Sequence, residues 1–142
     1  MGIGRLVISD WASPGRRDTE IPFPQWSVVE HAIRGLNNEN LNDLYMTPQT
    51  TSAKTFLGIC GGAGRYLVAG SIDGVSFPTL VDSNCTDCSL VPLVVGGQPG
   101  EYPRNWLVSL DAAIGAARAF FDAGGFDCGV RWTYAQGRAG VV

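Results

Sequence analysis

Cys85 and Cys88 are the residues whose spacing most directly suggests chemistry. Two cysteines separated by two residues can hold a metal ion or form a redox pair. A structural zinc site needs four ligands, and the other candidates (Cys60, Cys128 and His31) form no second close pair. A thioredoxin-like pair should begin a helix, whereas this pair lies in a polar stretch that we expect to be a loop. Two reduced loop cysteines are the preferred interpretation. A thiol oxidoreductase or metal-binding protein that uses this pair is the alternative.

The other reactive residues form no catalytic arrangement. Residues 58–64 (GICGGAG) are similar to a phosphate-binding loop, but we expect them to join two strands, and phosphate-binding loops open a helix. His31 is the single histidine and lies at a polar position of an expected helix. Acid–base catalysis would therefore need carboxylates, and the sequence holds no recognisable carboxylate motif. The sequence predicts a protein with no catalytic residues, no cofactor and no metal.

Polar and aromatic residues in the expected turns are candidates for binding another protein. Carboxylates in successive turns can face a basic protein surface together, although solvated turn residues are the simpler interpretation. Tyr102 lies in residues 98–104, which we expect to be an exposed loop, and tyrosine is a common interface anchor. The predicted partner-binding residues are Asp73, Asp82, Asp87, Gln98, Glu101, Tyr102 and Arg104.

Length and charge limit the possible functions. The 142 residues predict a single domain over residues 1–135 and a frayed tail over residues 136–142. A net charge of −3 without a basic tract argues against a dedicated nucleic-acid binder. No apolar run approaches the ~18 residues of a membrane-spanning helix, and the N-terminal apolar stretch is too short for a secretory signal. The expected location is the cytoplasm, with no membrane partner. The oligomeric state is not readable from the sequence.

The strongest expected element is a helix that begins after Ser109. The Ser109 hydroxyl can cap the first turn, and Asp111 places a negative charge at the positive end of the helix dipole. Gly124 and Gly125 end the helix, because glycine adopts the left-handed conformation without penalty. Gly115 inside the helix costs about 1 kcal/mol relative to alanine, and a close approach to a sheet would explain it. The apolar stripe comprises Leu110, Ala113, Ile114, Ala117, Phe120 and Phe121.

The rest of the chain predicts an antiparallel sheet and a second helix. A helix follows Trp26, with Ser27 as its N-cap and Glu30 completing a capping box. Residues 10–23 are expected to be a loop, and Asp73 with Gly74 marks a hairpin. Strands are expected over residues 5–9, 44–47, 54–60, 65–72, 75–81, 90–95, 106–108 and 129–134. The fold class is therefore α+β, an antiparallel sheet of about five to seven strands with two helices packed on one face.

The order of several segments resembles a known family. The segments are residues 26, 33–36 (IRGL), 57–62 (LGICGG), 79–82 (TLVD), 94–98 (VVGGQ), 100–103 (GEYP), 108–113 (VSLDAA), 116–121 (AARAFF), 124–125 (GG) and 130–132 (VRW). Over roughly residues 20–135, this pattern resembles immunity protein family one of bacterial polymorphic toxin systems. The Cys85 and Cys88 pair and the long loop before Trp26 depart from that family.

The resemblance implies a small cytoplasmic protein that binds and neutralises a cognate toxin, often a nucleic-acid deaminase. Such a protein has no catalytic residues, and it would occlude the active site or substrate groove of the toxin. A structural interaction module that has no toxin is a further alternative.

Overall fold

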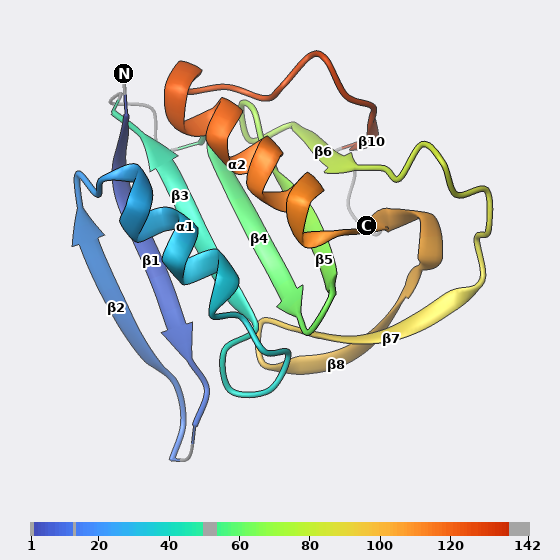
Figure 1. Cartoon of the computed structure of the whole chain (residues 1–142), viewed down its shortest axis with the longest axis horizontal. Helices are drawn as coiled ribbons and strands as arrows, with labels where there is room; N and C mark the ends of the chain where they lie inside the picture. Colours follow the sequence, from blue (N-terminus) through green and yellow to red (C-terminus); the bar gives the residue numbers. More distant parts are fainter. Residues whose placement is uncertain (1, 13, 50–53, 137–142) are drawn as a thin grey trace.

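A computed structural model describes residues 2–12, 14–49 and 54–136 of the chain (Figure 1). The predicted tail lies outside these residues except for Gln136, which ends the last strand. In chain order the elements are β1 (Ile3–Asp10), β2 (Arg17–Pro22), α1 (Trp26–Arg34), β3 (Asp43–Pro48), β4 (Phe56–Gly62), β5 (Arg65–Ser71), β6 (Ser76–Leu80), β7 (Leu90–Val95), β8 (Gln98–Pro103), η1 (Arg104–Trp106), β9 (Leu107–Val108), α2 (Leu110–Ala123) and β10 (Trp132–Gln136).

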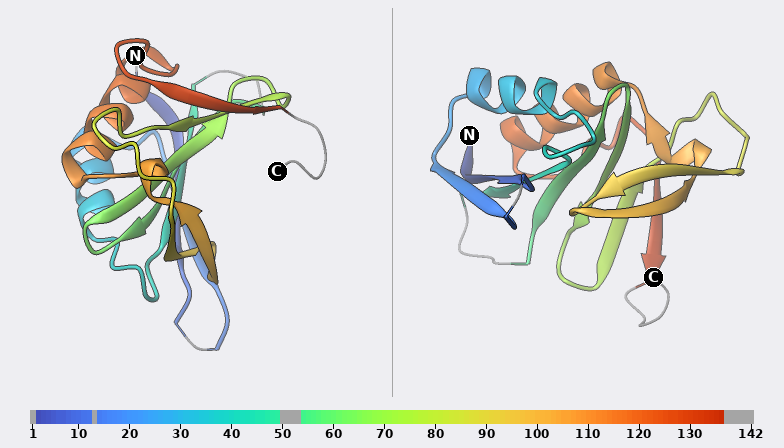
Figure 2. Two further views of the ribbon diagram at one scale, coloured as in Figure 1. Left: turned by 90° about the vertical axis from the view of Figure 1, so that its right-hand side faces the viewer. Right: turned by 90° about the horizontal axis from the view of Figure 1, so that it is seen from below.

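The described strands form a large antiparallel sheet in the order β10-β6-β5-β4-β3-β1-β2, with β9 paired to β5. Both helices lie on one face of this sheet, and α2 contacts β4, β5 and β1 (Figures 1 and 2). Strands β7 and β8 form a separate hairpin. The predicted α+β class, with two helices on one face of an antiparallel sheet, is confirmed.

Helix α2 forms as its sequence predicts. The Ser109 hydroxyl accepts a hydrogen bond of 3.1 Å from the Ala112 backbone N–H. Gly124 ends the helix with a φ of 72°, the left-handed conformation that favours glycine. Phe120 is fully buried at the centre of the core between the helices and the sheet. The apolar stripe therefore packs α2 on the sheet, as predicted.

The start of α1 differs from the prediction. The helix begins at Trp26, its N-cap is Gln25, and no side chain caps it, so the predicted capping box is wrong. Glu30 instead accepts from Arg34 at 2.8 Å on the helix surface. The helix starts early because the Trp26 ring packs edge-on against Phe121 of α2, with ring centroids 5.6 Å apart. The packing between helices thus overrides the local capping pattern.

Two predicted loops contain strands. Residues 10–23 include β2, which pairs with β1 from Arg5 opposite Pro22 to Asp10 opposite Arg17. Strand β2 is an exposed, charged edge strand without apolar alternation, so its sequence carries little strand signal. Residues 98–103 form β8, which pairs with β7 across Gly96 and Gly97. These glycines have φ values of 59° and 78°, as a two-residue hairpin turn requires.

The β7–β8 hairpin covers part of the sheet face opposite the helices (Figure 2). Ile59 belongs to the core on the helix side, whereas its neighbour Cys60 packs in a second, smaller core. Successive residues of a strand point to opposite faces, so the second core lies on the other face of the sheet. Val91 and Leu93 of β7 fill it together with Leu67.

Side chains from the segment between α1 and β3 hold the hairpin in place. Asn42 is completely buried; its Oδ1 accepts from the Gly97 backbone N–H at 2.9 Å, and its Nδ2 donates to the Glu39 carbonyl at 2.8 Å. Asn38 donates to the Val94 carbonyl at 2.8 Å and accepts from the Val94 N–H at 3.3 Å. The two asparagines therefore attach the end of β7 and the hairpin turn to the main body.

Candidate functional site

The Cys85 and Cys88 pair lies in the irregular segment between β6 and β7, as predicted. All four cysteines are free thiols; Cys60 is buried, whereas Cys88 and Cys128 are exposed. The Cys85 sulfur lies 3.9 Å from the Asp87 carbonyl. No helix begins at the pair. Among residues 2–12, 14–49 and 54–136, no group of three or more histidine, cysteine, aspartate or glutamate side chains could hold a metal ion.

The glycine-rich stretch joins β4 to β5 as a hairpin, which confirms the structural interpretation of residues 58–64. Gly62 has a φ of 127°, and a Cβ atom there would lie 2.6 Å from the Asn38 backbone nitrogen. Only glycine fits this conformation and this contact without a shift of the backbone. The stretch therefore serves packing between the hairpin and the asparagine-rich segment.

The structure brings three of the predicted partner-binding residues together. Asp82 and Asp87 lie in the β6–β7 loop beside Arg104 of η1: the Asp82 N–H donates to the Asn105 carbonyl at 2.8 Å, and the Asn105 N–H donates to the Asp87 carbonyl at 3.1 Å. Hydrogen bonds from the Ser89 backbone and hydroxyl lower the pKa of Asp87, and the charge of Arg104 lowers it further. This loop is therefore fixed in place by backbone hydrogen bonds, with Asp87 held ionised.

Asp73 and Gln98 lie elsewhere. Asp73 is in the β5–β6 turn, at the opposite end of β6 from Asp82. Hydrogen bonds from the backbone N–H groups of Ser76 (2.7 Å) and Val75 (2.9 Å) lower its pKa. Gln98 begins β8 beside the hairpin turn, whereas η1 follows the other end of β8. The predicted residues thus do not form one cluster.

Glu101 and Tyr102 occupy successive positions of β8, not of an exposed loop, so that prediction is wrong. Glu101 is exposed opposite Pro92. Tyr102 is half-buried against the second core, and this burial, followed by the nearby Cys60 thiol, raises its pKa. Gly96 and Gly97 impose this arrangement, because their tight turn pairs the two strands. Tyr102 therefore helps to attach the hairpin to the sheet.

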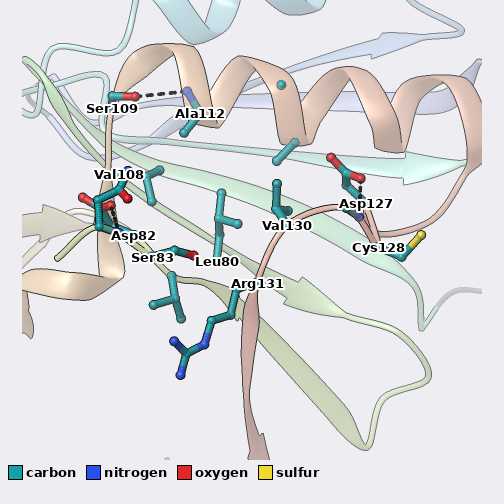
Figure 3. A pocket seen from close by; sticks show the side chains of 15 residues that line it. Leu80, Asp82, Ser83, Val108, Ser109, Ala112, Asp127, Cys128, Val130 and Arg131 are labelled. Atoms are coloured by element: carbon teal, nitrogen blue, oxygen red, sulfur yellow. Dashed lines mark hydrogen bonds between the residues drawn. The ribbon is translucent and has the colours of Figure 1, made fainter. Parts of the chain in front are cut away.

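A groove beside α2 brings together residues that the sequence did not indicate as a site. Its volume is about 790 Å³ (Figure 3). It forms because α2 covers β4 and β5, while β6 and β10 lie beyond the helix layer (Figure 1). Residues from three separate segments line it. They are Leu80, Val81, Asp82, Ser83, Asn84, Val108, Ser109, Ala112, Gly115, Ala116, Asp127, Cys128, Gly129, Val130 and Arg131.

Gly115 belongs to this groove and makes no close approach to the sheet. No atom lies within 4 Å of the position that its Cβ would take, so the predicted packing reason is wrong. Ala113 and Ala117 are the fully buried alanines of α2. Gly115 instead lines the groove between Ala112 and Ala116, on the side of the helix that faces the β6–β7 loop. The small size of these three residues keeps the groove open.

Charged side chains line the groove on both sides. Asp82 accepts from the Asn84 backbone N–H at 3.0 Å, and Asp127 accepts from the Gly129 backbone N–H at 2.9 Å. Within the described part of the chain, neither carboxylate forms an ion pair, and Arg131 forms none either. The arginine points away from α2 (Figure 3). The groove thus combines apolar residues with two carboxylates that are positioned by the backbone.

Comparison of the sequence with protein-family models gives no match. Comparison with curated proteins gives no match either. The resemblance to immunity protein family one therefore stays a prediction. Neither helix of the described residues is long and apolar enough to cross a membrane.

Proposed function

We propose that this protein is an immunity protein that acts in the cytoplasm of the cell that makes its toxin. It binds the cognate toxin domain, a nucleic-acid deaminase, and blocks its active site or substrate groove. The protein itself carries out no reaction. The observation that supports this proposal is the uneven pairing of charges over the molecule.

The four ion pairs of the described residues lie on the β1–β2 hairpin and on the two helices. They join Arg5 with Glu20, Arg16 with Asp18, Arg34 with Glu30, and Arg118 with Asp122. Among the described residues, five carboxylates of the later elements form no ion pair. These are Asp82, Asp87, Glu101, Asp111 and Asp127. In residues 1–64, three of the six carboxylates form an ion pair, whereas five of the seven carboxylates in residues 65–136 form none with a described residue.

The sequence shows the same difference between the two parts of the chain. Residues 65–136 contain seven carboxylates and four arginines, whereas residues 1–64 contain six carboxylates and five cationic side chains. Arg65, Arg104 and Arg131 are the arginines of the later region that form no ion pair within the described residues. The later region therefore keeps most of the net negative charge, which favours a basic partner.

A deaminase toxin that acts on nucleic acid would be a basic partner of this kind, because it needs a basic surface to hold its substrate. Proteins hold phosphate groups with lysine and arginine side chains, and a carboxylate surface competes for the same side chains. Asp82 and Asp87 lie in a loop fixed by hydrogen bonds to Asn105, so little conformational entropy is lost when they bind. The acidic region of the β6–β7 loop is therefore suited to replace the nucleic acid in the toxin.

The test starts from the neighbouring gene, because the proposal expects a toxin-like domain encoded immediately upstream. Cells that express this domain should survive when they also express the wild-type protein. The variant Asp82→Asn/Asp87→Asn/Glu101→Gln should protect less well. The control variant Asp18→Asn/Glu20→Gln/Glu30→Gln removes the same charge from the ion-paired region and should protect fully.

A second control addresses the alternative thiol chemistry. The variant Cys85→Ser/Cys88→Ser should protect as well as the wild type, because a binding protein does not use the thiols. Loss of protection by this variant, with normal folding, would support the oxidoreductase instead. Death of toxin-expressing cells that also produce the folded wild-type protein would contradict the proposal.

A further inference from the structure

We propose that the groove beside α2 receives a segment of the toxin that carries apolar side chains flanked by lysine or arginine. This inference rests on the proposed function, and it specifies where and how the partner docks. The shape of the groove, its charges and the uncovered end of the sheet support it independently of one another.

The shape of the groove fits side chains of another protein. Its volume of about 790 Å³ lies in the range of about 300–1,000 Å³ that is usual for binding pockets. Leu80 and Val108 line it as buried residues of the core, and Val130 is 45% exposed at its rim. Gly115 has open space where a side chain would project. A glycine inside a helix costs about 1 kcal/mol, and no contact within the described chain explains why it stands there.

The charges of the groove favour basic groups. Asp82 and Asp127 lie on different sides of the groove (Figure 3). Backbone N–H groups hold both carboxylates in place, and neither has an ion-pair partner in the described chain. Asp111, on the first turn of α2 next to the lining residue Ala112, is an exposed carboxylate beside the groove. Among the described residues that line the groove, Arg131 is the one cation, and it extends away from α2 (Figure 3). Lysine or arginine side chains on either side of an apolar anchor would therefore meet carboxylates.

The position of the groove in the fold also favours a segment from another protein. α1 and α2 cover one part of the sheet, whereas β6 and β10 extend beyond α2 (Figure 1). Sheet faces in domains are normally covered by a second layer. Among the described residues, residues 124–131 connect α2 to β10 at this end of the sheet (Figure 1). A segment of the toxin would complete the layer beside α2.

The direct test fills the groove without changing its charge. The variant Gly115→Phe places an aromatic ring in open space, and a helical side chain leans toward the N-terminus of its helix, here toward Ala112. The matched control is Ala123→Phe, which adds a ring at an exposed position of α2 outside the groove. We expect the Kd for the toxin domain to rise about 100-fold for Gly115→Phe and to change less than about two-fold for Ala123→Phe.

The charge requirement needs a second pair of variants. Asp82→Asn/Asp127→Asn keeps the oxygen that accepts from the backbone but removes both negative charges, and it should raise the Kd about ten-fold or more. Asp18→Asn/Asp122→Asn removes two ion-paired charges and should have little effect. Circular dichroism and thermal unfolding of each variant confirm that it is folded.

The outcomes separate the groove from the proposed function. If Gly115→Phe is folded and still inhibits the toxin like the wild type, the groove is not the docking site, although the protein is an immunity protein. If the wild type does not inhibit the toxin, the proposed function fails. Binding of a model peptide then tests whether the groove accepts basic and apolar side chains. The peptide Lys-Leu-Lys-Leu-Lys should shift the NMR signals of Gly115 and Gly129 and bind about ten-fold tighter than Glu-Leu-Glu-Leu-Glu. Equal binding of the two peptides, or none, would overturn the groove proposal.

Discussion

Replacing Asn42 with alanine should loosen the β7–β8 hairpin and lower the stability of the whole protein. Asn42 is completely buried, and its side chain joins the Gly97 N–H to the Glu39 carbonyl. The hairpin carries Glu101 and Tyr102 and packs on the sheet through the second core. One buried side chain thus connects the segment before β3 to the hairpin turn.

The magnitude follows from the two partners that the substitution leaves behind. Removing one partner of a buried hydrogen bond costs about 1–3 kcal/mol for each group left unsatisfied. Two such groups, at Gly97 and Glu39, sum to about 2–6 kcal/mol. Both hydrogen bonds are only part-buried, so we expect the lower part of this range, about 2–4 kcal/mol, as the loss in the free energy of unfolding. Domains of this size are stable by about 5–15 kcal/mol, so the variant should still fold. Alanine cannot replace either hydrogen bond.

The assay is urea unfolding at pH 7 and 25 °C, followed by tryptophan fluorescence and circular dichroism. The midpoint should fall while the slope stays close to the wild-type value, because the folded state buries the same surface. Amide hydrogen exchange at Gly97 should become faster than in the wild type. Asn84→Ala, at an exposed position in the β6–β7 loop, is the control and should change the stability by less than about 0.5 kcal/mol. A loss below about 1 kcal/mol for Asn42→Ala would refute the reasoning.

Three further predictions concern α2 and the buried thiol. Gly115→Ala should raise the free energy of unfolding by about 0.5–1 kcal/mol in urea, because the site is an open helix interior; a decrease would contradict this. Ser109→Ala should lower the thermal midpoint, with a loss of about 1 kcal/mol, because it removes the cap of α2; an unchanged midpoint would count against the cap. Burial raises the pKa of Cys60 from 9.0 to about 12, so the unfolded thiol loses its proton first. The contribution of the protonated Cys60 thiol to the free energy of unfolding is therefore fully present below pH 9. It is lost as the pH rises toward 12, at up to about 1.4 kcal/mol per pH unit. Urea unfolding at pH 8 and pH 10 should show this loss in the wild type and less of it in Cys60→Ala; equal losses would refute it.

The parts of the fold that the sequence predicts correctly are those with local signals. Ser109 and Gly124 mark the two ends of α2 by capping, and the glycine-rich turn before Arg65 pairs β4 with β5. Strand β2 was missed because an exposed edge strand needs no apolar alternation. Strand β8 was missed because it contains Pro99 and Gly100, which weaken a strand pattern, while the turn before it imposes the pairing.

The candidate site was predictable only in part, because distant segments build it. Asp82 and Asp87 were identified from the sequence, and the structure places them with Arg104. Asp127 and Gly115 could not be identified as site residues from the sequence, because the groove forms only in the folded chain. There, residues 80–84, 108–116 and 127–131 lie together. The cost of Gly115 inside a helix was the one signal in the sequence, and the sheet was the wrong explanation for it.

Binding to the toxin domain tests the central claim most directly. Isothermal titration calorimetry of the purified wild-type protein against the domain encoded upstream should show one-to-one binding. The Kd should rise with added salt, because carboxylates meet basic groups. In the same samples, the deaminase activity of the toxin should disappear at equimolar protein. Full deaminase activity in the presence of excess folded protein would contradict the account.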